Sequence, residues 1–326
     1  MKKGMGKLNA FAAAVALLTG AACTDVRGIK TLPEENSLMA LATEQKESRL
    51  VLLSPCIGTN DDSVIRWTWS PKTDPGIKPS DVALFATPDE CKLRDDGRTI
   101  LLTASGGAFA DIDVASGRVR AYGNVGGNPH SVERLPDGAY VVASSDGNRL
   151  TVVDVKGAEL NPSKQRKSVF PLRDAHGVEW DARRNCLWAI TVWDVVRYSY
   201  DSERKSLTPM NTYSFKKIGF GGGHDLVLFP SPKGDRLWLT AHEGAASLDP
   251  DTGAFEIIWR VGCPSVSRYG NYRLFVRSTE RWWTDAVTAR PVSPPDKPLT
   301  YRLKGARFYK VKLLKPSTVW RLDRGE

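Results

Sequence analysis

The stretch that decides the fold is residues 128–154, which read NPHSVERLPDGAYVVASSDGNRLTVVD. Three short runs rich in aliphatic residues are separated here by the pairs Asp137-Gly138 and Gly147-Asn148. Such pairs favour the tight turns of β-hairpins, because they tolerate the positive φ angles that these turns require. The stretch therefore predicts three antiparallel strands in succession.

The same pattern recurs along the chain. Its second strand, an apolar run of four residues, begins at Leu50, Ile100, Tyr140, Leu187, Leu237 and Leu274. These starts are 37 to 50 residues apart, which is typical of the blades of β-propellers. No amphipathic stretch long enough for a major helix interrupts them. We therefore expect an all-β chain that forms a single β-propeller of four-stranded antiparallel blades around a central channel.

Both ends of the chain bear on the number of blades. A propeller usually closes its ring by pairing strands from the two chain ends in one blade, and residues 307–314 alternate so that they could complete the blade containing Leu50. Six blades are favoured, with five or seven as alternatives. We expect residues 1–22 to be a signal peptide, residues 23–48 a polar connector and residues 49–326 the propeller domain.

The N-terminus has the features of an export signal. Three lysines in the first seven residues precede an apolar run over residues 8–18, and small residues then lead to Cys23. The run is too short to span a bilayer. Residues 18–23 resemble a bacterial lipobox, which makes Cys23 the expected lipidation site; cleavage by a general signal peptidase is the alternative. We expect a protein of the cell envelope, either a lipoprotein held at the membrane by its lipid alone or a periplasmic protein.

The composition of the 326 residues is that of an ordinary globular protein. Hydrophobic residues make up 41%, charged residues 25%, and the formal net charge is +9. The basic residues are spread along the chain except at residues 164–167 and in the tail 302–315, both of which we interpret as solvated surface. The positive excess could attract an anionic ligand. The charge pattern does not indicate nucleic-acid binding, and we expect a monomer.

Five cysteines leave the redox state open. Once Cys23 is lipidated, Cys56, Cys91, Cys186 and Cys263 remain. Export would place them in an oxidising compartment, where disulfides form, but each lies in or beside an apolar run. Their wide spacing excludes a zinc-ribbon pattern. Buried free thiols and one or two disulfides are equally compatible with the sequence.

Histidine is unevenly distributed. The chain has four histidines, and His130, His176 and His224 occupy the same point of three successive repeats. That point is the start of a blade's innermost strand, where side chains of different blades converge on the mouth of the channel. Three neutral imidazoles there could bind Zn²⁺ or Mn²⁺ and leave a position for water or substrate. Asp225 and His242 could supply a fourth ligand or orient the others.

Other residues are candidates for catalysis or ligand binding. Lys92, Arg268 and Arg277 lie near predicted inner or second strands, where they would suit an anionic substrate. Trp193 could stack against a sugar ring. Asn128, just before the first of the aligned histidines, completes the predicted ligand-binding set with Trp193 and Arg268.

The aligned residues also have a purely structural interpretation. Duplication carries a residue to the same position of each repeat, and an inner-strand histidine can bond to backbone carbonyls and fill the channel. Glu133 and Glu179 lie three places after their histidines. Strand alternation therefore predicts that they point to the opposite side and contact a neighbouring blade.

Two resemblances support the propeller. The motif of a small residue, Pro or Ala, His and an apolar residue, followed by Asp-Gly and an aliphatic strand, is similar to the inner-strand motif of NHL, SMP-30-like and streptogramin-lyase-like propellers. More of the chain, residues 50–246, resembles a bacterial group, the domain-of-unknown-function family 6528. The matching segments are residues 67–71, 103–107, 127–131, 175–177 and 222–225. This resemblance implies a fold and no established activity.

Two functions are compatible with these observations, since no nucleophile elbow, P-loop or dinucleotide fingerprint is found. The first is an exported, lipid-anchored propeller whose metal site acts on an anionic carbohydrate. As a lyase it would bind the substrate carboxylate at the metal, while His242 or a basic residue such as Lys92 or Arg277 removes the adjacent proton. The second is a non-catalytic cell-surface scaffold that binds a carbohydrate or a peptide at the same mouth.

Overall fold

The computed structural model of the protein describes residues 38–58, 60–95, 97–231, 234–316 and 320. The chain divides into a unit of residues 1–31, outside the described residues, and a unit of residues 32–326. The predicted signal peptide and Cys23 therefore lie outside the described part of the chain. Within that part, no helix is long and apolar enough to cross a membrane.

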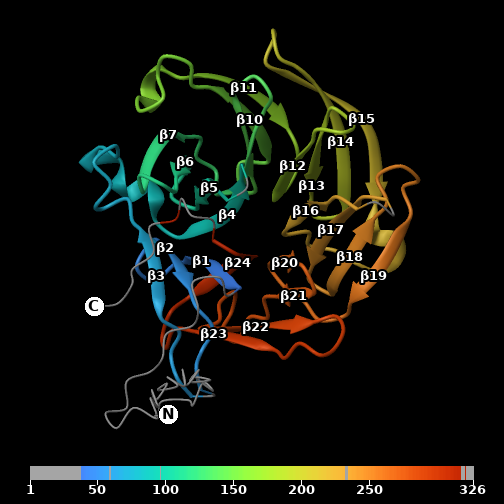
Figure 1. Cartoon of the computed structure of the whole chain (residues 1–326). Coiled ribbons are helices and arrows are strands. Elements are labelled where there is room, and N and C mark those ends of the chain that lie inside the picture. Colours follow the sequence, from blue (N-terminus) through green and yellow to red (C-terminus); the bar gives the residue numbers. More distant parts are fainter. Residues whose placement is uncertain (1–37, 59, 96, 232–233, 317–319, 321–326) are drawn as a thin grey trace, which may run out of the picture. The chain divides into compact units, whose positions relative to one another are not determined.

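The unit of residues 32–326 is built from six antiparallel sheets of four strands each, which we name blades A to F in chain order (Figure 1). Blade A contains β1 (Met39–Glu44), β2 (Arg49–Leu53), β3 (Ile65–Trp69) and β24 (Phe308–Leu314), and blade B contains β4 (Pro88–Arg94), β5 (Thr99–Ala104), β6 (Ala108–Asp113) and β7 (Arg118–Asn124). Blade C contains β8 (Pro129–Arg134), β9 (Tyr140–Ser144), β10 (Arg149–Asp154) and β11 (Arg166–Pro171), and blade D contains β12 (Gly177–Asp181), β13 (Cys186–Ile190), β14 (Asp194–Asp201) and β15 (Ser206–Ser214). Blade E contains β16 (Leu226–Phe229), β17 (Arg236–Ala241), β18 (Gly244–Leu248) and β19 (Phe255–Trp259), and blade F contains β20 (Val266–Tyr269), β21 (Tyr272–Phe275), β22 (Ala286–Pro291) and β23 (Leu299–Arg302). Short 3-10 helices span Pro79–Phe85 (η1), Pro162–Lys164 (η2) and Phe215–Ile218 (η3). The predicted six-bladed propeller is confirmed.

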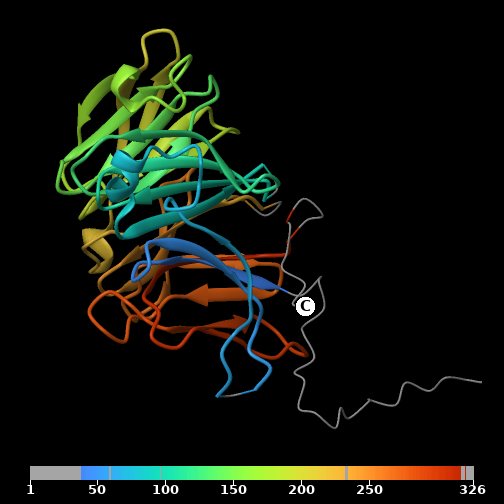
Figure 2. The ribbon, with the colours of Figure 1, turned by 90° about the vertical axis from the view of Figure 1, so that its left-hand side faces the viewer.

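The innermost strands line the channel. They are β24, β4, β8, β12, β16 and β20, one from each blade, and most consecutive members of this series are in contact. In blade A the last strand of the chain pairs with the first, so that Met39 lies opposite Leu314. Figure 2 shows the blue strands of blade A beside the red end of the chain. The closure predicted from residues 307–314 is thus confirmed.

The predicted start of the propeller at residue 49 is too late. Strand β1 lies inside the segment assigned to a polar connector, yet all six of its residues are buried. The polar residue Glu44 can be buried because its carboxylate accepts hydrogen bonds from the backbone N–H of Lys46 (2.9 Å) and of Arg307 (3.1 Å). The sequence alone does not distinguish a glutamate that is buried with its carboxylate hydrogen-bonded from one that is exposed to solvent.

Apolar clusters fill the interfaces between neighbouring blades, which we call seams. Side chains alternate along each strand, so every blade has one face toward each neighbour. Among the described residues, hydrophobic clusters occupy the seams A–B, B–C, C–D, D–E and F–A. None of these clusters bridges blades E and F.

The described cysteines are all free thiols. Cys91, Cys186 and Cys263 are buried, Cys56 is partly buried, and none of the four forms a disulfide. Burial raises the pKa of the Cys263 thiol to about 12 and that of Cys91 further still. The structure therefore agrees with the free-thiol alternative, and the raised pKa values keep the thiols of Cys91 and Cys263 protonated at neutral pH.

Candidate functional site

The predicted histidines come together at one end of the channel. His130 is the second residue of β8. His176 directly precedes β12, and His224 lies two residues before β16. The ring centroids of His130 and His176 are 4.6 Å apart, and those of His176 and His224 are 5.2 Å apart. His242, just after β17, lies 5.1 Å from His224. Four imidazoles thus form a continuous row, which we call the imidazole row, at the channel mouth.

A glycine-rich turn brings the chain close to the last imidazole. The backbone N–H of His242 donates a 2.9 Å hydrogen bond to the carbonyl of Gly221, and that of Gly222 donates a 2.7 Å bond to Val192. Gly222 has φ of +66°, and a Cβ there would overlap the ring of His242. Only glycine allows both this backbone conformation and this approach.

Burial keeps the inner imidazoles uncharged. Desolvation lowers the pKa of His130 well below its usual value and lowers that of His224 to about 3, with repulsion from neighbouring imidazoles and Lys310 adding to the effect. Desolvation also lowers the pKa of His176, although nearby Asp174 opposes the shift. A neutral imidazole is the form that binds a metal ion or accepts a proton.

Three buried polar atoms at the mouth have no hydrogen-bond partner in the described part of the chain. They are the Nδ1 atoms of His130 and His224 and the Oδ1 atom of Asn128. By contrast, Nδ1 of His176 lies 3.1 Å from the carbonyl oxygen of Asp174. Leaving a buried polar atom unpaired costs about 1–3 kcal/mol. These three atoms are therefore the places where a bound ligand would contribute most.

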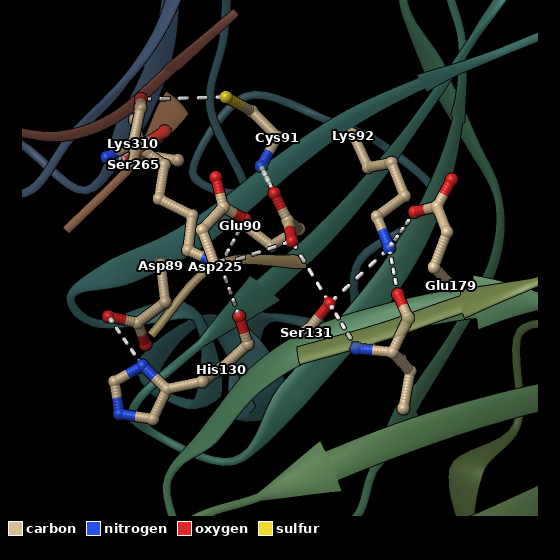
Figure 3. Close-up of polar contacts among 12 residues, drawn as sticks. Asp89, Glu90, Cys91, Lys92, His130, Ser131, Glu179, Asp225, Ser265 and Lys310 are labelled. Atoms are coloured by element: carbon tan, nitrogen blue, oxygen red, sulfur yellow. Dashed lines mark hydrogen bonds and ion pairs between the residues drawn. The ribbon is translucent and has the colours of Figure 1, made fainter. Parts of the chain in front are cut away.

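Asp89 and Tyr309 complete the mouth, and the sequence-based reasoning missed both. Each is the second residue of an inner strand, as His130 is in β8. Oδ1 of Asp89 lies 3.9 Å from Nδ1 of His130 (Figure 3), and the ring of Tyr309 lies 6.1 Å from the imidazole of His130. Aligning the inner strands by position rather than by residue type would have found them.

Asp89 retains a proton at neutral pH. Its carboxyl group accepts hydrogen bonds from Oγ of Ser105 (2.7 Å) and from Nε2 of Gln45 (3.2 Å). Burial nevertheless raises its pKa to about 8, because the stabilising effects of Ser105 and Lys310 are smaller than the cost of desolvating the charge. Asp89 can therefore donate a proton beside a row of imidazoles that can accept one.

Beneath the mouth, the channel is filled by ion pairs. Nζ of the fully buried Lys310 lies 3.2 Å from Glu90 and 3.2 Å from Asp225 (Figure 3). Nζ of Lys312 lies 2.7 Å from Asp225. Burial alone would raise the pKa of Asp225, but the two lysines hold it well below the usual range. The predicted metal ligand Asp225 is thus a counter-ion. The interpretation of the tail as solvated surface is wrong for both lysines.

A second set of ion pairs continues down the channel. Nζ of Lys92 lies 3.3 Å from Glu179 and 3.5 Å from Glu133, and Arg94 bridges the same two carboxylates. Nζ of Lys92 is surrounded by these carboxylates, the hydroxyl of Ser131 and the carbonyl of Val178, so it is not available to a ligand at the mouth. Glu133 contacts the neighbouring blade B, as predicted, and Glu179 pairs with the same two basic residues, so both glutamates belong to this channel network. In blade C a register shift between Pro129 and Ser131 changes the alternation of β8.

The remaining predicted residues divide between the two ends of the blades. Trp193 and Arg277 are exposed and follow the second strands β13 and β21, the position that His242 has after β17. Nζ of Lys216 lies 4.5 Å from the ring centre of Trp193. Arg268 is near the far end of β20, where it lines a cavity between blades E and F. The structure therefore does not place Arg268 with the histidines.

The imidazole row has the spacing, but not the present orientation, of a metal site. No group of three or more His, Cys, Asp and Glu side chains in the described part of the chain is arranged to hold a metal ion. Two imidazoles whose nitrogens each lie about 2.1 Å from one ion would have ring centres roughly 4.5–5.2 Å apart. The separations of 4.6 to 5.2 Å fall in this range. Each neighbouring pair of rings therefore has the spacing of two ligands of one ion.

Solved structures with a similar fold share little sequence with this chain. A chain of the nidogen/laminin complex has a TM-score of 0.52 at 14% identity, with 85% of this chain and 98% of that chain covered. The Cps50 (Swd1) β-propeller domain of Myceliophteria thermophila has a TM-score of 0.48 at 12% identity, with 87% and 88% covered. Hydrazine synthase of Kuenenia stuttgartiensis has a TM-score of 0.44 at 15% identity, with 62% of this chain covered; the alignment spans about half, 55%, of that chain.

Sequence identities of 12 to 15% show a similar fold and nothing about function. No curated protein matches the chain by sequence. The family model of DUF6528, described as a family of unknown function, matches residues 5–321. Because this match covers nearly the whole chain, including every blade, the protein belongs to the DUF6528 family.

Proposed function

We propose that this protein is a metal-dependent lyase for acidic carbohydrates, with Zn²⁺ or Mn²⁺ bound at the channel mouth by His130, His176 and His224. The observation that carries the proposal is the imidazole row: the rings of His130, His176 and His224 have lowered pKa values and the spacing of metal ligands, and two of them have a buried Nδ1 without a hydrogen-bond partner. Neutral imidazole is a preferred ligand of Zn²⁺.

The surrounding residues fit an elimination reaction. In β-elimination from a uronic acid, the proton next to the carboxylate is removed and the bond to the leaving oxygen breaks; a metal that neutralises the carboxylate makes this proton more acidic. His242 is exposed at the end of the row and is the group we assign as the base. Asp89, protonated below about pH 8, is the group we assign as the proton donor to the leaving oxygen. Arg277 and Trp193 would hold the sugar at the rim.

The proposal includes an extracytoplasmic location. Its support is the sequence of residues 1–22 and the lipobox-like segment that ends at Cys23. Mass spectrometry of the mature N-terminus tests it, because lipidation would leave a diacylglycerol-modified Cys23 as the first residue. An unprocessed Met1 would contradict export.

Metal analysis is the first test of the site. We expect purified protein to contain stoichiometric Zn or Mn, and His176→Ala to lose it. Arg277→Ala is the matched control, because Arg277 lies at the same rim but is not a proposed ligand; this variant should retain the metal and bind acidic sugars more weakly. A protein that takes up neither metal on dialysis, with unchanged thermal stability in chelator, would contradict the metal proposal.

The reaction requires its own assay. We expect the metal-loaded protein to release unsaturated products from polysaccharides that contain uronic acids and none from neutral polysaccharides. Asp89→Asn should slow product formation while metal content stays unchanged, because Asp89 is assigned to proton transfer and not to metal binding. Metal binding without any unsaturated product would contradict the proposed lyase activity and indicate a metal-dependent binding protein instead.

A non-catalytic surface protein is the second candidate. The observation that favours it is the commitment of Lys92 and Asp225 to internal ion pairs, which leaves fewer charged groups for chemistry at the mouth. This candidate predicts saturable binding of a carbohydrate or peptide by the metal-free monomer, with the ligand recovered intact.

A further inference from the structure

The seam between blades E and F has a different composition from the other seams. On blade E, Leu237 and Leu239 of β17 belong to the apolar cluster shared with blade D. Alternation along the strand therefore turns Arg236 and Trp238 toward blade F. This face of the blade carries a guanidinium and an indole, and among the described residues no cluster of buried apolar side chains joins it to blade F.

Blade F matches this arrangement from the other side. Leu274 and Val276 belong to the cluster shared with blade A. Arg273 and Phe275, the residues that alternate with them, therefore face blade E. The guanidinium of Arg273 lies 5.4 Å from the ring centre of Trp238, a contact that crosses the seam.

Aromatic rings form a column across this seam. Trp238 and Phe275 are nearly parallel, with ring centres 6.2 Å apart and planes 4° apart, and Phe275 and Trp259 are parallel within 5° at 5.2 Å. Phe229 extends the column on the side of Trp238, at 5.0 Å. Trp259, at the other end, is 39% exposed. The column thus ends in an indole face that a ligand can reach.

Two cavities lie along the column and share Ile258 and Arg273. Each has a volume of about 360 Å³, within the range of small-ligand sites. The outer cavity is lined by Trp259 and by Pro291 and Val292, which gives it an apolar wall. Together they form one cleft, which we call the E–F cleft.

The E–F cleft has an excess of unpaired positive charge. Arg268, Arg273 and Arg290 line it, and none of them has a carboxylate partner among the described residues. Nε of Arg273 is buried with no hydrogen-bond acceptor. Arg236 is neutralised by Asp249 at 3.0 Å, and Glu256 is the acidic residue of the lining. A guanidinium with a buried N–H group that lacks an acceptor favours an anionic ligand.

We propose that the E–F cleft is a second binding site, independent of the metal centre at the mouth, for a carbohydrate that carries carboxylate or sulfate groups. The exposed face of Trp259 and the apolar wall beside it pack against a pyranose ring, as indole faces do. Arg273 and Arg290 bind the anionic group, because the planar guanidinium can donate two parallel hydrogen bonds to a carboxylate or sulfate. The volume of each cavity suits one sugar unit of a longer chain.

Calorimetric titration of the full-length protein tests this proposal with three oligosaccharides of equal length: a polyuronate, a sulfated chain and a neutral chain. We expect at least one anionic chain to bind and the neutral chain to bind at least about tenfold more weakly. The preferred anionic chain identifies whether carboxylate or sulfate is the recognised group. Equal binding of the neutral chain, or no binding of either anionic chain at millimolar concentration, would overturn the proposal.

Substitutions locate the site. Arg273→Ala should weaken binding of the anionic chain at least about tenfold, and Trp259→Ala several-fold. Arg273→Lys keeps the charge but loses the two parallel donors, so it should bind more weakly than the wild type even if Arg273→Ala folds poorly. The matched control is Arg166→Ala on blade C, whose guanidinium is 82% exposed and outside the cleft.

Two further measurements test whether the E–F cleft and the channel mouth bind their ligands independently. His176→Ala and chelator-treated protein should retain the anionic carbohydrate at the cleft, whereas Arg273→Ala should retain the metal at the mouth. If His176→Ala abolishes all carbohydrate binding and both Arg273 variants bind like the wild type, the cleft is not a binding site.

Discussion

The interior and the mouth of the channel use similar side chains in opposite ways. In the interior, Lys310 has two carboxylate partners, and Lys312 has one. At the mouth, Nδ1 of His130 and Nδ1 of His224 have no hydrogen-bond partner among the described residues, and Asp89 retains its proton. A complete set of ion pairs holds the inner strands together and offers nothing to a ligand. A ligand can supply the missing partners of the unpaired polar groups at the mouth. The difference therefore distinguishes polar groups that stabilise the fold from polar groups that are available to bind a ligand.

The largest expected effect concerns the interior. Lys310→Met should lower the free energy of unfolding by about 3–5 kcal/mol, because Glu90 and Asp225 would lose a buried partner that methionine cannot replace. Chemical denaturation monitored by tryptophan fluorescence measures the change. Metal content per folded molecule should stay the same, since Lys310 lies beneath the imidazole row.

Arg166→Ala is the matched control for Lys310→Met. It removes a basic residue from an ion pair with Asp154, but this pair is at the surface. Exposed pairs contribute about 0–1 kcal/mol, so the variant should unfold nearly like the wild type. Equal stability of the two variants would show that the interior ion pairs do not hold the propeller together.

The next effect concerns the pH dependence of the mouth. Asp89 has a pKa of about 8 in the folded protein, higher than in the unfolded chain. Between these two pKa values the unfolded chain releases a proton that the folded protein retains, so Asp89 lowers stability as the pH rises, by up to about 1.4 kcal/mol per pH unit. Asp89→Asn removes this dependence. The stability of the variant relative to the wild type should therefore increase from about pH 5 to about pH 8.

Denaturation curves at several pH values test this expectation. His130 faces Asp89 at 3.9 Å, while Glu90, Lys310 and Tyr309 also act on its carboxyl group. Asp95→Asn is the control, because its carboxylate is partly exposed and its pKa is lowered by Arg134 and Thr99 despite some desolvation. Its stability relative to the wild type should not increase over the same range. Parallel pH profiles for Asp89→Asn and the wild type would mean that Asp89 is ionised at the mouth.

The sequence allowed us to predict the features of the channel that recur in every repeat or at the same position of successive repeats. The turn pairs and strand spacing gave six blades, and the alignment of His130, His176 and His224 placed three imidazoles at one mouth. It missed Asp89 and Tyr309, because these occupy the same strand position with a different residue type.

Other features depend on contacts between distant parts of the chain. The burial of Lys310 and Lys312 follows from the pairing of the last strand with the first, which puts a basic tail at the centre of the propeller. The register shift in β8 likewise cannot be predicted from alternation alone. The E–F cleft was also missed, since Arg236 and Arg273 have the alternating pattern of an exposed strand face.

The smallest expected effect separates the position of His242 from the stability of the fold. Gly222 and Gly138 both have positive φ, +66° and +86°, so alanine at either position should cost about 1–2 kcal/mol in backbone strain. A Cβ at Gly138 meets nothing within 4 Å, whereas one at Gly222 overlaps the ring of His242. Only Gly222→Ala should therefore displace the imidazole, shift its NMR resonances and reduce the proposed lyase activity, while both variants lose similar stability. If Gly222→Ala leaves the resonances of His242 unchanged, the close approach of this turn does not position the proposed base, and the difference between mouth and interior would rest on the other three imidazoles.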